Sequence, residues 1–336
     1  MDRDEPAGDS GEDRLIARFF RPLVTAPGAL GLMDDAATLT PPPDHDLVLT
    51  VDALVAGVHF FPHDPPDLIA RKALRVNLSD LAAKGAAPAG CLLALALPSD
   101  MQEAWLEAFS RGLGADVEEF ACPLFGGDTV STPGPLTISV TAFGTLPRGT
   151  AVRRRGARPG DRIVVTGTIG DAALGLALRR GDEAAARWSL NEEQRSLLIG
   201  RYLMPRPRLA VAEALRVSAT AAMDVSDGLV GDLAKLCRAS GVSATVQAAA
   251  VPLSDGARRA YDADFAVRTT LLGGGDDYEI LATVPPAALS ALQRRGAELG
   301  IPFTDIGVIA AGDGNVSLLD RNGKALDLAR ASFSHF

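Results

Sequence analysis

Acidic residues recur in this sequence at positions where they could build an oxygen-rich cation site. They stand beside Gly, Ala, Ser or Thr at the expected ends of elements in both halves of the chain: Asp34, Asp35, Asp52, Asp80, Asp128, Asp224, Asp227, Asp276 and Asp277. One such residue is a routine turn or cap, but the same context at six places is harder to explain by capping alone. Carboxylates that converge repel one another unless a cation lies between them, and all-oxygen sites favour Mg²⁺ or Ca²⁺. Sites with few protein ligands and substrate phosphates favour Mg²⁺, so the pattern predicts a magnesium site.

The stretch from Gly31 to His59 should carry the first of these acids. The short apolar run 47–51 is typical of a buried strand that delivers Asp52 at its end. Asp34 and Asp35 precede it across a Pro-rich turn, so a hairpin-like return could bring the three carboxylates together. His59 is either a substrate contact or an ordinary loop residue.

A helix is expected downstream, with Asp67 as a plausible N-cap and Gly85 just past its end. Asn77 and Asp80 are three residues apart, so they share a face of this helix in an apolar setting. A strand over 123–125 should then stop at G-G-D-T, the motif that contains Asp128.

The second half contains two junctions between a strand and a helix. At T-G-T-I-G-D, residues 166–171, the turn either offers N–H groups to a phosphate or uses Gly for geometry alone. At D-V-S-D-G-L, Asp224, Ser226 and Asp227 lie together, and Ser226 or Asp227 could equally be the helix N-cap.

Length and composition indicate a compact protein of two α/β domains. The chain has 336 residues, 47% of them hydrophobic, and a net charge of −9, which gives no general attraction for nucleic acid. We expect a disordered tail over 1–13, an N-terminal domain over 14–148 and a C-terminal domain over 149–336, with a basic, Gly- and Pro-rich boundary. The polar N-terminus and short apolar runs predict a cytoplasmic protein without a membrane span.

Several chemistries lack their sequence signatures. The cysteines Cys91, Cys122 and Cys237 show no metal spacing and are expected in the core. There is no Walker motif, protein-kinase motif set, Ser-His-Asp set or Cys-His set. Any ATP must therefore be held through metal ions and a few basic residues, for which Arg154 and its neighbours are candidates, unless they form a solvated linker.

Taken together, the motifs resemble the thiamine-monophosphate kinase family of the aminoimidazole-ribonucleotide-synthetase-like superfamily. They are G-x-x-D-D-A-A, T-x-D-x-L-V-A-G-x-H-F, N-L-S-D-L-A-A-x-G-A, G-G-D-T, R-x-G-A-x-P-G-D-x-I-x-V-T-G-x-x-G-D and D-x-S-D-G-L, and the likeness runs from about residue 14 to the C-terminal S-H-F. The resemblance implies a two-domain α/β protein with mixed α+β sheets, whose N-terminal domains pair in a homodimer. It further implies ATP and several Mg²⁺ ions in a cleft between domains, and transfer of the γ-phosphoryl group of ATP to thiamine monophosphate.

The resemblance also implies roles for individual residues. The positions that match magnesium ligands are Asp35, Thr50, Asp52, Asp80, Asp128, Asp224 and, for a further ion, Asp227. Those that match ATP contacts are Gly127, Asp128, Arg154 and Ser226, and those that match substrate contacts are His59, Asp276 and Phe333. The chain departs from the family at Asp276, where Glu is frequent, and near the C-terminus, where Leu328 or Phe333 stands for an aromatic substrate contact.

The chemistry expected of such an enzyme fits the residues present. A phosphate monoester is already largely ionised at neutral pH, so thiamine monophosphate needs no general base. The difficulty is to bring two polyanions together, which Mg²⁺ ions held by Asp clusters would relieve. Two alternatives stay open: a selenide, water dikinase-like or hydrogenase-maturation-like enzyme, and a metal- and nucleotide-binding protein without turnover. The first needs a reactive thiol or selenol near the N-terminal Gly-rich segment or the C-terminus, where this chain has neither.

Overall fold

The structure, a computed structural model, describes residues 11–326 and residue 332. Its contacts divide the chain into two compact units. Unit 1 comprises the described residues up to Asn77 together with Pro88–Thr145, and unit 2 comprises Leu78–Ala87 and the described residues from Leu146 onward. Units defined by contacts are not the same as folding domains, so the boundary at 148/149 stays a prediction. Residues 11–13, which the sequence assigned to the tail, belong to helix α1 (Gly11–Leu15).

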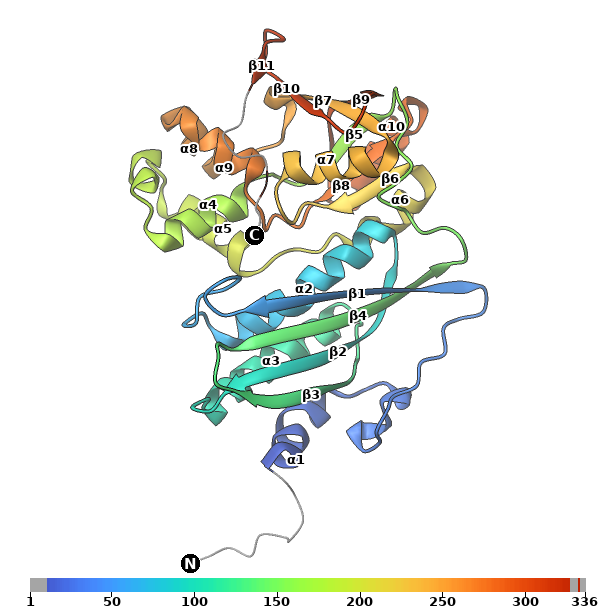
Figure 1. The fold of residues 1–336 in the computed structure, drawn as a ribbon, viewed down its shortest axis with the longest axis vertical. Helices are drawn as coiled ribbons and strands as arrows, with labels where there is room; N and C mark the ends of the chain where they lie inside the picture. Colours follow the sequence, from blue (N-terminus) through green and yellow to red (C-terminus); the bar gives the residue numbers. More distant parts are fainter. Residues whose placement is uncertain (1–10, 327–331, 333–336) are drawn as a thin grey trace, which may run out of the picture. The chain divides into compact units, whose positions relative to one another are not determined.

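Unit 1 is built on a four-stranded sheet in the order β1-β4-β2-β3 (Figure 1). Its strands are β1 (His45–Val55), β2 (Ala87–Pro98), β3 (Leu124–Thr132) and β4 (Thr137–Pro147), and β2 pairs with β3 in parallel. Helices α2 (Pro66–Lys84) and α3 (Glu103–Glu119) lie against one face, where α3 buries Leu106, Phe109 and Leu113. On β1, Leu47, Leu49 and Val51 are exposed and none of residues 47–51 is buried, so the run forms the expected strand but the prediction that this strand is buried is wrong.

Two expected strand ends in unit 1 are wrong. Asp52 lies inside β1, because the strand continues to Val55. G-G-D-T does not end β3, which runs through it to Thr132. A Cβ on Gly127 would lie 1.8 Å from the carbonyl oxygen of Leu93, so this glycine permits close pairing with β2 rather than a turn. Asp34 and Asp35 lie in an irregular segment before β1, not in the strand of a hairpin.

The helix expected after Asp67 is confirmed, with a different start. It begins at Pro66, so Asp67 is in its first turn and is not its N-cap. Gly85 ends it as expected: its φ is +78°, and the next N–H, of Ala86, bonds to the carbonyl of Leu81 at 2.9 Å.

Unit 2 is built on a seven-stranded mixed sheet in the order β11-β10-β7-β9-β5-β8-β6 (Figure 1). Its strands are β5 (Arg162–Thr166), β6 (Ala221–Asp224), β7 (Val242–Gln247), β8 (Ile280–Val284), β9 (Phe303–Ala311), β10 (Val316–Leu319) and β11 (Ala325–Leu326). The neighbours pair antiparallel except β10 with β7, which pair in parallel. The mixed α+β sheets of the expected fold are therefore present.

Helices bury both faces of this sheet. They are α4 (Asp171–Arg180), α5 (Glu192–Leu203), α6 (Ala212–Ser218), α7 (Leu229–Ser240), α8 (Asp255–Ala263), α9 (Arg268–Gly273) and α10 (Pro286–Glu298). On the central strand β5, Ile163 and Val165 join one core cluster, shared with α4, α5, α7, α8 and α9. Val164 joins the other, shared with α6, α10 and the end of α2. Strands buried on both faces explain the continuous apolar runs in this half.

Two further expectations concern the whole chain. Cys91, Cys122 and Cys237 are buried and free, as expected of core residues. In the described part of the chain, no helix is both long and apolar enough to cross a membrane.

Candidate active site

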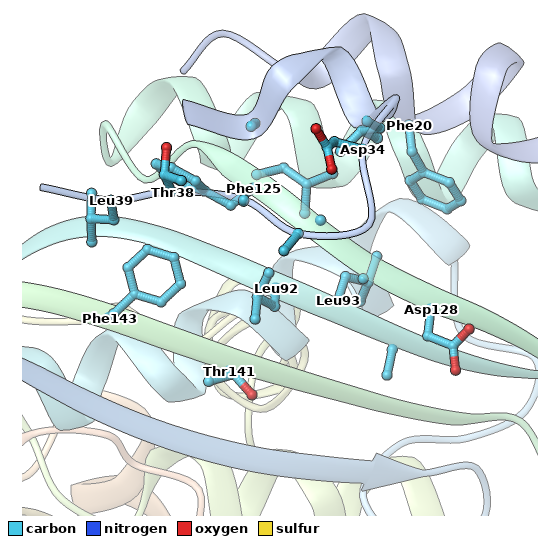
Figure 2. Close-up of a pocket in the computed structure, with 18 of the residues that line it drawn as sticks. Phe20, Asp34, Thr38, Leu39, Leu92, Leu93, Phe125, Asp128, Thr141 and Phe143 are labelled. Carbon is cyan, nitrogen blue, oxygen red and sulfur yellow. The ribbon is translucent and has the colours of Figure 1, made fainter. Parts of the chain in front are cut away.

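A pocket in unit 1 gathers three of the residues predicted from the sequence. Asp35, Gly127 and Asp128 line one cavity of about 820 Å³, which Asp34 also lines (Figure 2). Asp128 reaches it from the edge strand β3, and Asp34 and Asp35 from the irregular segment before β1. Carboxylates from two separate segments therefore share a cavity with a glycine at which the backbone is open to a ligand.

Thr50 and Asp52 do not line this pocket. On β1 they alternate with the exposed Leu49 and Val51, and side chains of neighbouring strand residues point to opposite faces of a sheet. The structure therefore places Thr50 and Asp52 on one strand and separates them from Asp35 and Asp128. The convergence of Asp34, Asp35 and Asp52 expected from the sequence is not found within unit 1.

His59 lies after β1 with its ring orientation fixed. Its Nδ1 accepts a hydrogen bond from the N–H of Val55 at 2.9 Å, and its carbonyl oxygen accepts one from Lys72 Nζ at 3.1 Å. A neutral ring with Nδ1 as acceptor carries its proton on Nε2. The Nδ1 side of the His59 ring is therefore held against the backbone of Val55.

A second group of predicted residues meets in unit 2, around the last turns of α2. Asp224, at the end of β6, accepts a hydrogen bond from Ser79 Oγ at 2.7 Å. Burial raises the pKa of Asp224 to about 8, and the negative charge of Asp80 adds to the shift. Two acids far apart in sequence thus lie within electrostatic reach of each other, and the repulsion between them is what a bound cation would relieve.

Lys84, which sequence reasoning missed, lies in the same cluster. Its Nζ donates to the carbonyl oxygen of Ala222 at 2.8 Å. Burial lowers the pKa of Lys84, while the charges of Asp224 and Asp80 oppose that shift and Arg154 reinforces it. The predicted ATP contact Arg154 therefore lies within electrostatic reach of Lys84, which itself lies near the two acids, and the cluster combines carboxylates with two cationic side chains.

The turn between β6 and α7 holds Ser226 and Asp227. A buried carboxylate, that of Asp232, accepts hydrogen bonds from both of their N–H groups, at 3.0 and 2.9 Å. Asp232 therefore fixes the turn that precedes α7. The N-cap of α7 is Gly228, with no side-chain cap hydrogen bond, so the prediction of Ser226 or Asp227 as N-cap is wrong. Lys235 forms ion pairs with both Asp227 and Asp232.

The loop that carries Asp276 packs against this turn. The N–H of Asp276 donates to the carbonyl of Ser226, and that of Tyr278 to the carbonyl of Val225, both at 2.9 Å. A Cβ on Gly228 would lie 2.6 Å from the backbone of Gly273, so glycine permits this close approach. The structure therefore brings the predicted contacts Ser226 and Asp276 together.

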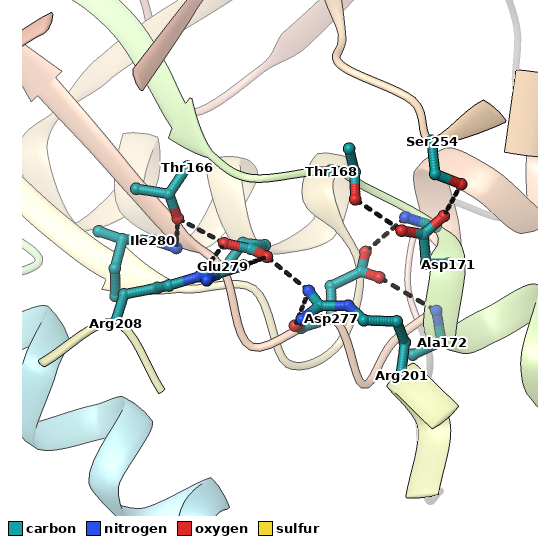
Figure 3. A network of polar contacts seen from close by, with 11 residues as sticks. Thr166, Thr168, Asp171, Ala172, Arg201, Arg208, Ser254, Asp277, Glu279 and Ile280 are labelled. Atoms are coloured by element: carbon teal, nitrogen blue, oxygen red, sulfur yellow. Dashed lines mark hydrogen bonds and ion pairs between the residues drawn. The ribbon is translucent and has the colours of Figure 1, made fainter. Parts of the chain in front are cut away.

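A buried network not anticipated from the sequence supports the loop (Figure 3). The fully buried Glu279 accepts hydrogen bonds from Arg201 at 2.5 Å, from Arg208 Nε at 2.6 Å and from Thr166 Oγ1 at 2.7 Å. Two arginines and a hydroxyl thereby tie the ends of β5 and β8 to the segments around α5. The loop is anchored by charge at its C-terminal end.

The carboxyl of Asp277 lies at the T-G-T-I-G-D turn, where the sequence left open whether the N–H groups bind a phosphate. Its carboxyl accepts hydrogen bonds from the N–H groups of Gly170, at 2.7 Å, and Ala172, at 3.4 Å (Figure 3). Burial raises the pKa of Asp277 well above its ordinary value. The N-terminus of α4 is therefore occupied by a carboxyl of this chain, and the interpretation of this turn as a phosphate site is wrong.

The predicted substrate contact Phe333, like Leu328, lies outside the described residues. Its neighbour Ser332 is described, and Ser332 Oγ donates to the carbonyl oxygen of Asp227 at 3.3 Å. A residue of the C-terminal segment thus reaches the turn that carries Ser226 and Asp227.

The donor chemistry of these groups fits Mg²⁺, although the metal ligands stay a prediction. Among the residues that the structure describes, no three or more His, Cys, Asp or Glu side chains are grouped so as to hold a metal ion. Asp80 and Asp224, which interact electrostatically, and Asp35 and Asp128, which line the same pocket, offer only oxygen donors. Such partial sets suit an ion that takes its remaining ligands from water and substrate phosphates.

Comparison with known proteins identifies the class. The family model described as AIR synthase related protein, N-terminal domain, matches residues 33–146, and that of the AIR synthase related protein, C-terminal domain, matches residues 158–320. The chain thus has both domains of an AIR synthase related protein.

Individual relatives narrow the assignment. Thiamine-monophosphate kinase of Caulobacter vibrioides is 45% identical over 303 residues, covering 89% of this chain and 84% of the relative. The thiamine-monophosphate kinase of Salmonella typhimurium is 43% identical over 329 residues, which cover 97% of this chain and 98% of the relative. The chain belongs to the thiamine-monophosphate kinase family.

Solved structures support the assignment to this family. The crystal structure of thiamine-monophosphate kinase from Stenotrophomonas maltophilia K279a superposes with a TM-score of 0.77 at 40% identity, covering 94% of this chain and 96% of that one. A structure of AaThiL complexed with AMPPCP and TMP gives a TM-score of 0.75 at 31% identity, and the match covers 92% of this chain and 97% of that one. The hydrogenase maturation protein HypE in complex with ATP, at 22% identity and a TM-score of 0.77, shares the fold alone.

Proposed function

We propose that this protein transfers the γ-phosphoryl group of ATP to thiamine monophosphate, giving thiamine diphosphate and ADP, and that it requires Mg²⁺. The observation that carries the proposal is the cluster of Asp80, Asp224, Lys84 and Arg154 in a chain of this family. It combines carboxylates for a divalent cation with cationic groups for phosphate, which is what joining two polyanions requires. ATP and Mg²⁺ are both present in the cytoplasm, which we propose as its location.

The proposed ligands of Mg²⁺ are Asp35, Thr50, Asp52, Asp80, Asp128, Asp224 and Asp227. Bound Mg²⁺ supplies charge neutralisation and orientation to the phosphates. Gly127, Arg154 and Ser226 bind ATP in this proposal, and Lys84 adds a positive charge close to Arg154. His59, Asp276 and Phe333 bind thiamine monophosphate in this proposal, Asp276 through attraction to the cationic thiazolium ring. The acceptor phosphate needs no base because it is already largely ionised at neutral pH.

The test is an assay of the purified protein with ATP, MgCl₂ and thiamine monophosphate, with thiamine diphosphate followed by chromatography. We expect product that disappears on addition of EDTA. ADP release that does not depend on thiamine monophosphate would point to another ATP-dependent enzyme. ATP binding without ADP release would point to a protein without turnover.

We also propose that two copies pair through the open face of the unit 1 sheet. Leu49 and Val51 of β1 are 64% and 60% exposed, and Leu92 and Val130 elsewhere in the sheet are also exposed. Exposed apolar side chains on several strands of one sheet favour an interaction surface, and the family resemblance makes a second copy its occupant. This pairing would cover the apolar residues of β1 that the fold leaves exposed.

Substitution of this face should change the oligomeric state. We expect a dimer for the wild-type protein and a monomer for Leu49→Glu, because a buried unpaired carboxylate opposes association. Light scattering during size-exclusion chromatography measures the mass. Val217→Glu is the matched control, since Val217 is 81% exposed on α6 of unit 2. An unchanged mass for Leu49→Glu would rule this face out as the interface.

A further inference from the structure

Lys235 lies on α7, three residues after Asp232, with its ammonium group between two carboxylates. Its Nζ is 2.8 Å from Asp232 Oδ1 and also forms an ion pair with Asp227 Oδ2. The side chains of Lys235 and Asp227 are 31% and 36% exposed, whereas that of Asp232 is fully buried. One cation thus joins an accessible acid to an inaccessible one.

Asp232 and Asp227 make different contacts. Asp232 holds the turn, because its Oδ2 accepts the N–H groups of Ser226 and Asp227. The carboxylate of Asp227 faces Lys235, and Asp227 is one of the residues proposed above to bind Mg²⁺. An ammonium ion and a magnesium ion compete for the same carboxylate oxygens, so both cannot neutralise Asp227 equally well.

We propose that Lys235 is a positioning residue that occupies Asp227 until Mg²⁺ binds, and that it thereby sets the Mg²⁺ concentration at which this acid is loaded. When Mg²⁺ takes Asp227, Lys235 keeps its ion pair with Asp232, which stays in place because of its two N–H donors. This inference rests on the proposed use of Mg²⁺ but not on the identity of the phosphoryl acceptor.

A tethered competitor weakens the binding of the ion that it mimics. Removal of Lys235 should therefore strengthen Mg²⁺ binding, by about threefold to fivefold if the displaced contact has the strength of a partly exposed ion pair. A residue that merely stabilised the turn would have the opposite effect or none, because its loss would leave Asp227 less well placed.

The experiment is calorimetric titration of the full-length protein with MgCl₂, which reads binding without turnover. Lys235→Met should bind Mg²⁺ about threefold to fivefold more tightly than wild type, and Lys235→Arg should resemble wild type. Arg238→Met is the matched control, because Arg238 is an exposed cation on the same helix and is expected to leave the Mg²⁺ affinity unchanged. Circular dichroism checks the fold, and Lys235→Gln replaces Lys235→Met if the latter does not fold.

A double substitution completes the test. In an Asp227→Asn background, Lys235→Met should no longer change the Mg²⁺ affinity, since the contested carboxylate is gone. Equal or weaker Mg²⁺ binding by a folded Lys235→Met or Lys235→Gln protein would overturn the inference, as would an undiminished effect in the Asp227→Asn background. If the kinase assay gave no product but Lys235→Met bound Mg²⁺ more tightly than wild type, the proposed reaction would be wrong and the proposed role of Lys235 would still hold.

Discussion

Asp276 adopts a backbone conformation that residues other than glycine rarely take. Its φ is +70°, and Tyr278 two residues later has a φ of +51°. Hydrogen bonds to the carbonyls of Ser226 and Val225 hold both residues in this region. Strained backbone is often found at functional sites, so we expect the position of the Asp276 side chain to matter for binding.

Substitutions of Asp276 should separate this strain from binding. Asp276→Ala should be less stable than Asp276→Gly by about 1 kcal/mol, because a Cβ disfavours positive φ. Both variants should raise the KM for thiamine monophosphate by a similar factor, because both lose the carboxylate. Urea unfolding and steady-state kinetics measure the two effects. Equal stabilities would show that the backbone at this position is not strained.

Asp80 and Asp128 should be required for turnover. Asp80→Asn or Asp128→Asn removes a proposed Mg²⁺ ligand charge, and we expect kcat to fall by at least about 100-fold with the fold intact. Asp100→Asn, at an exposed position, is the control. Near-normal turnover in either variant would contradict the assignment of these acids to the metal.

The acids of the site could be recognised from the sequence, but most of their partners could not. Asp80 and Asp224 stand in motifs with small neighbours, whereas Lys84 gains its role from Ala222, 138 residues away. Glu279 likewise depends on Arg208, 71 residues away. Only the spacing of Asp232 and Lys235, three residues apart on one helix, was a local signal from which a pair could have been found.

At the scale of elements, the Glu279 network joins strands and helices through charge. Glu279→Gln would leave Arg201 and Arg208 without their buried counter-charge, and we expect a loss of about 3–5 kcal/mol in the free energy of unfolding. Chemical denaturation measures it. Glu298→Gln is the matched control, because the exposed pair of Glu298 with Arg295 should be worth less than about 1 kcal/mol. Similar losses for both substitutions would mean that the network does not hold these elements together.

Helices were easier to predict than strand ends, for a physical reason. The caps and periodicity of α2 are local, so the end of the helix at Gly85 could be read from the chain. The length of β1 and β3 depends on neighbouring strands that the sequence does not reveal. Asp52 and Gly127 are residue types that often end strands. Asp52 nevertheless lies inside β1, on a partly exposed sheet face, and Gly127 lies inside β3, because close pairing with β2 requires a glycine there.

At the scale of the whole molecule, buried carboxyls make stability depend on pH. Burial is the main cause of the raised pKa of Asp171, Asp224, Asp232 and Asp277. A carboxyl whose folded pKa exceeds its unfolded pKa favours folding below the unfolded value, and this contribution is lost as the pH rises through the folded value. For Asp224 the window runs from its ordinary value of 3.8 to about 8.

In EDTA, the melting temperature should therefore fall as the pH rises from about 4 towards 8. Asp224→Asn should reduce this slope, because it removes one of the four carboxyls. Differential scanning calorimetry across this range measures both. A melting temperature that rises steadily towards pH 8 would show that these groups do not govern the stability of the metal-free protein.

Helix α2 contributes its first twelve residues, 66–77, to unit 1 and its last seven, 78–84, to unit 2. From that end, Ala82 and Ala83 enter the core of unit 2, and Ser79 donates to Asp224. A gene segment that encoded only residues 146–336 would therefore lack part of its own hydrophobic interior and a hydrogen-bond donor to one of its acids. The C-terminal half is not a transferable module, and recombination that exchanged it between relatives would have to carry a stretch from the first third of the coding sequence with it.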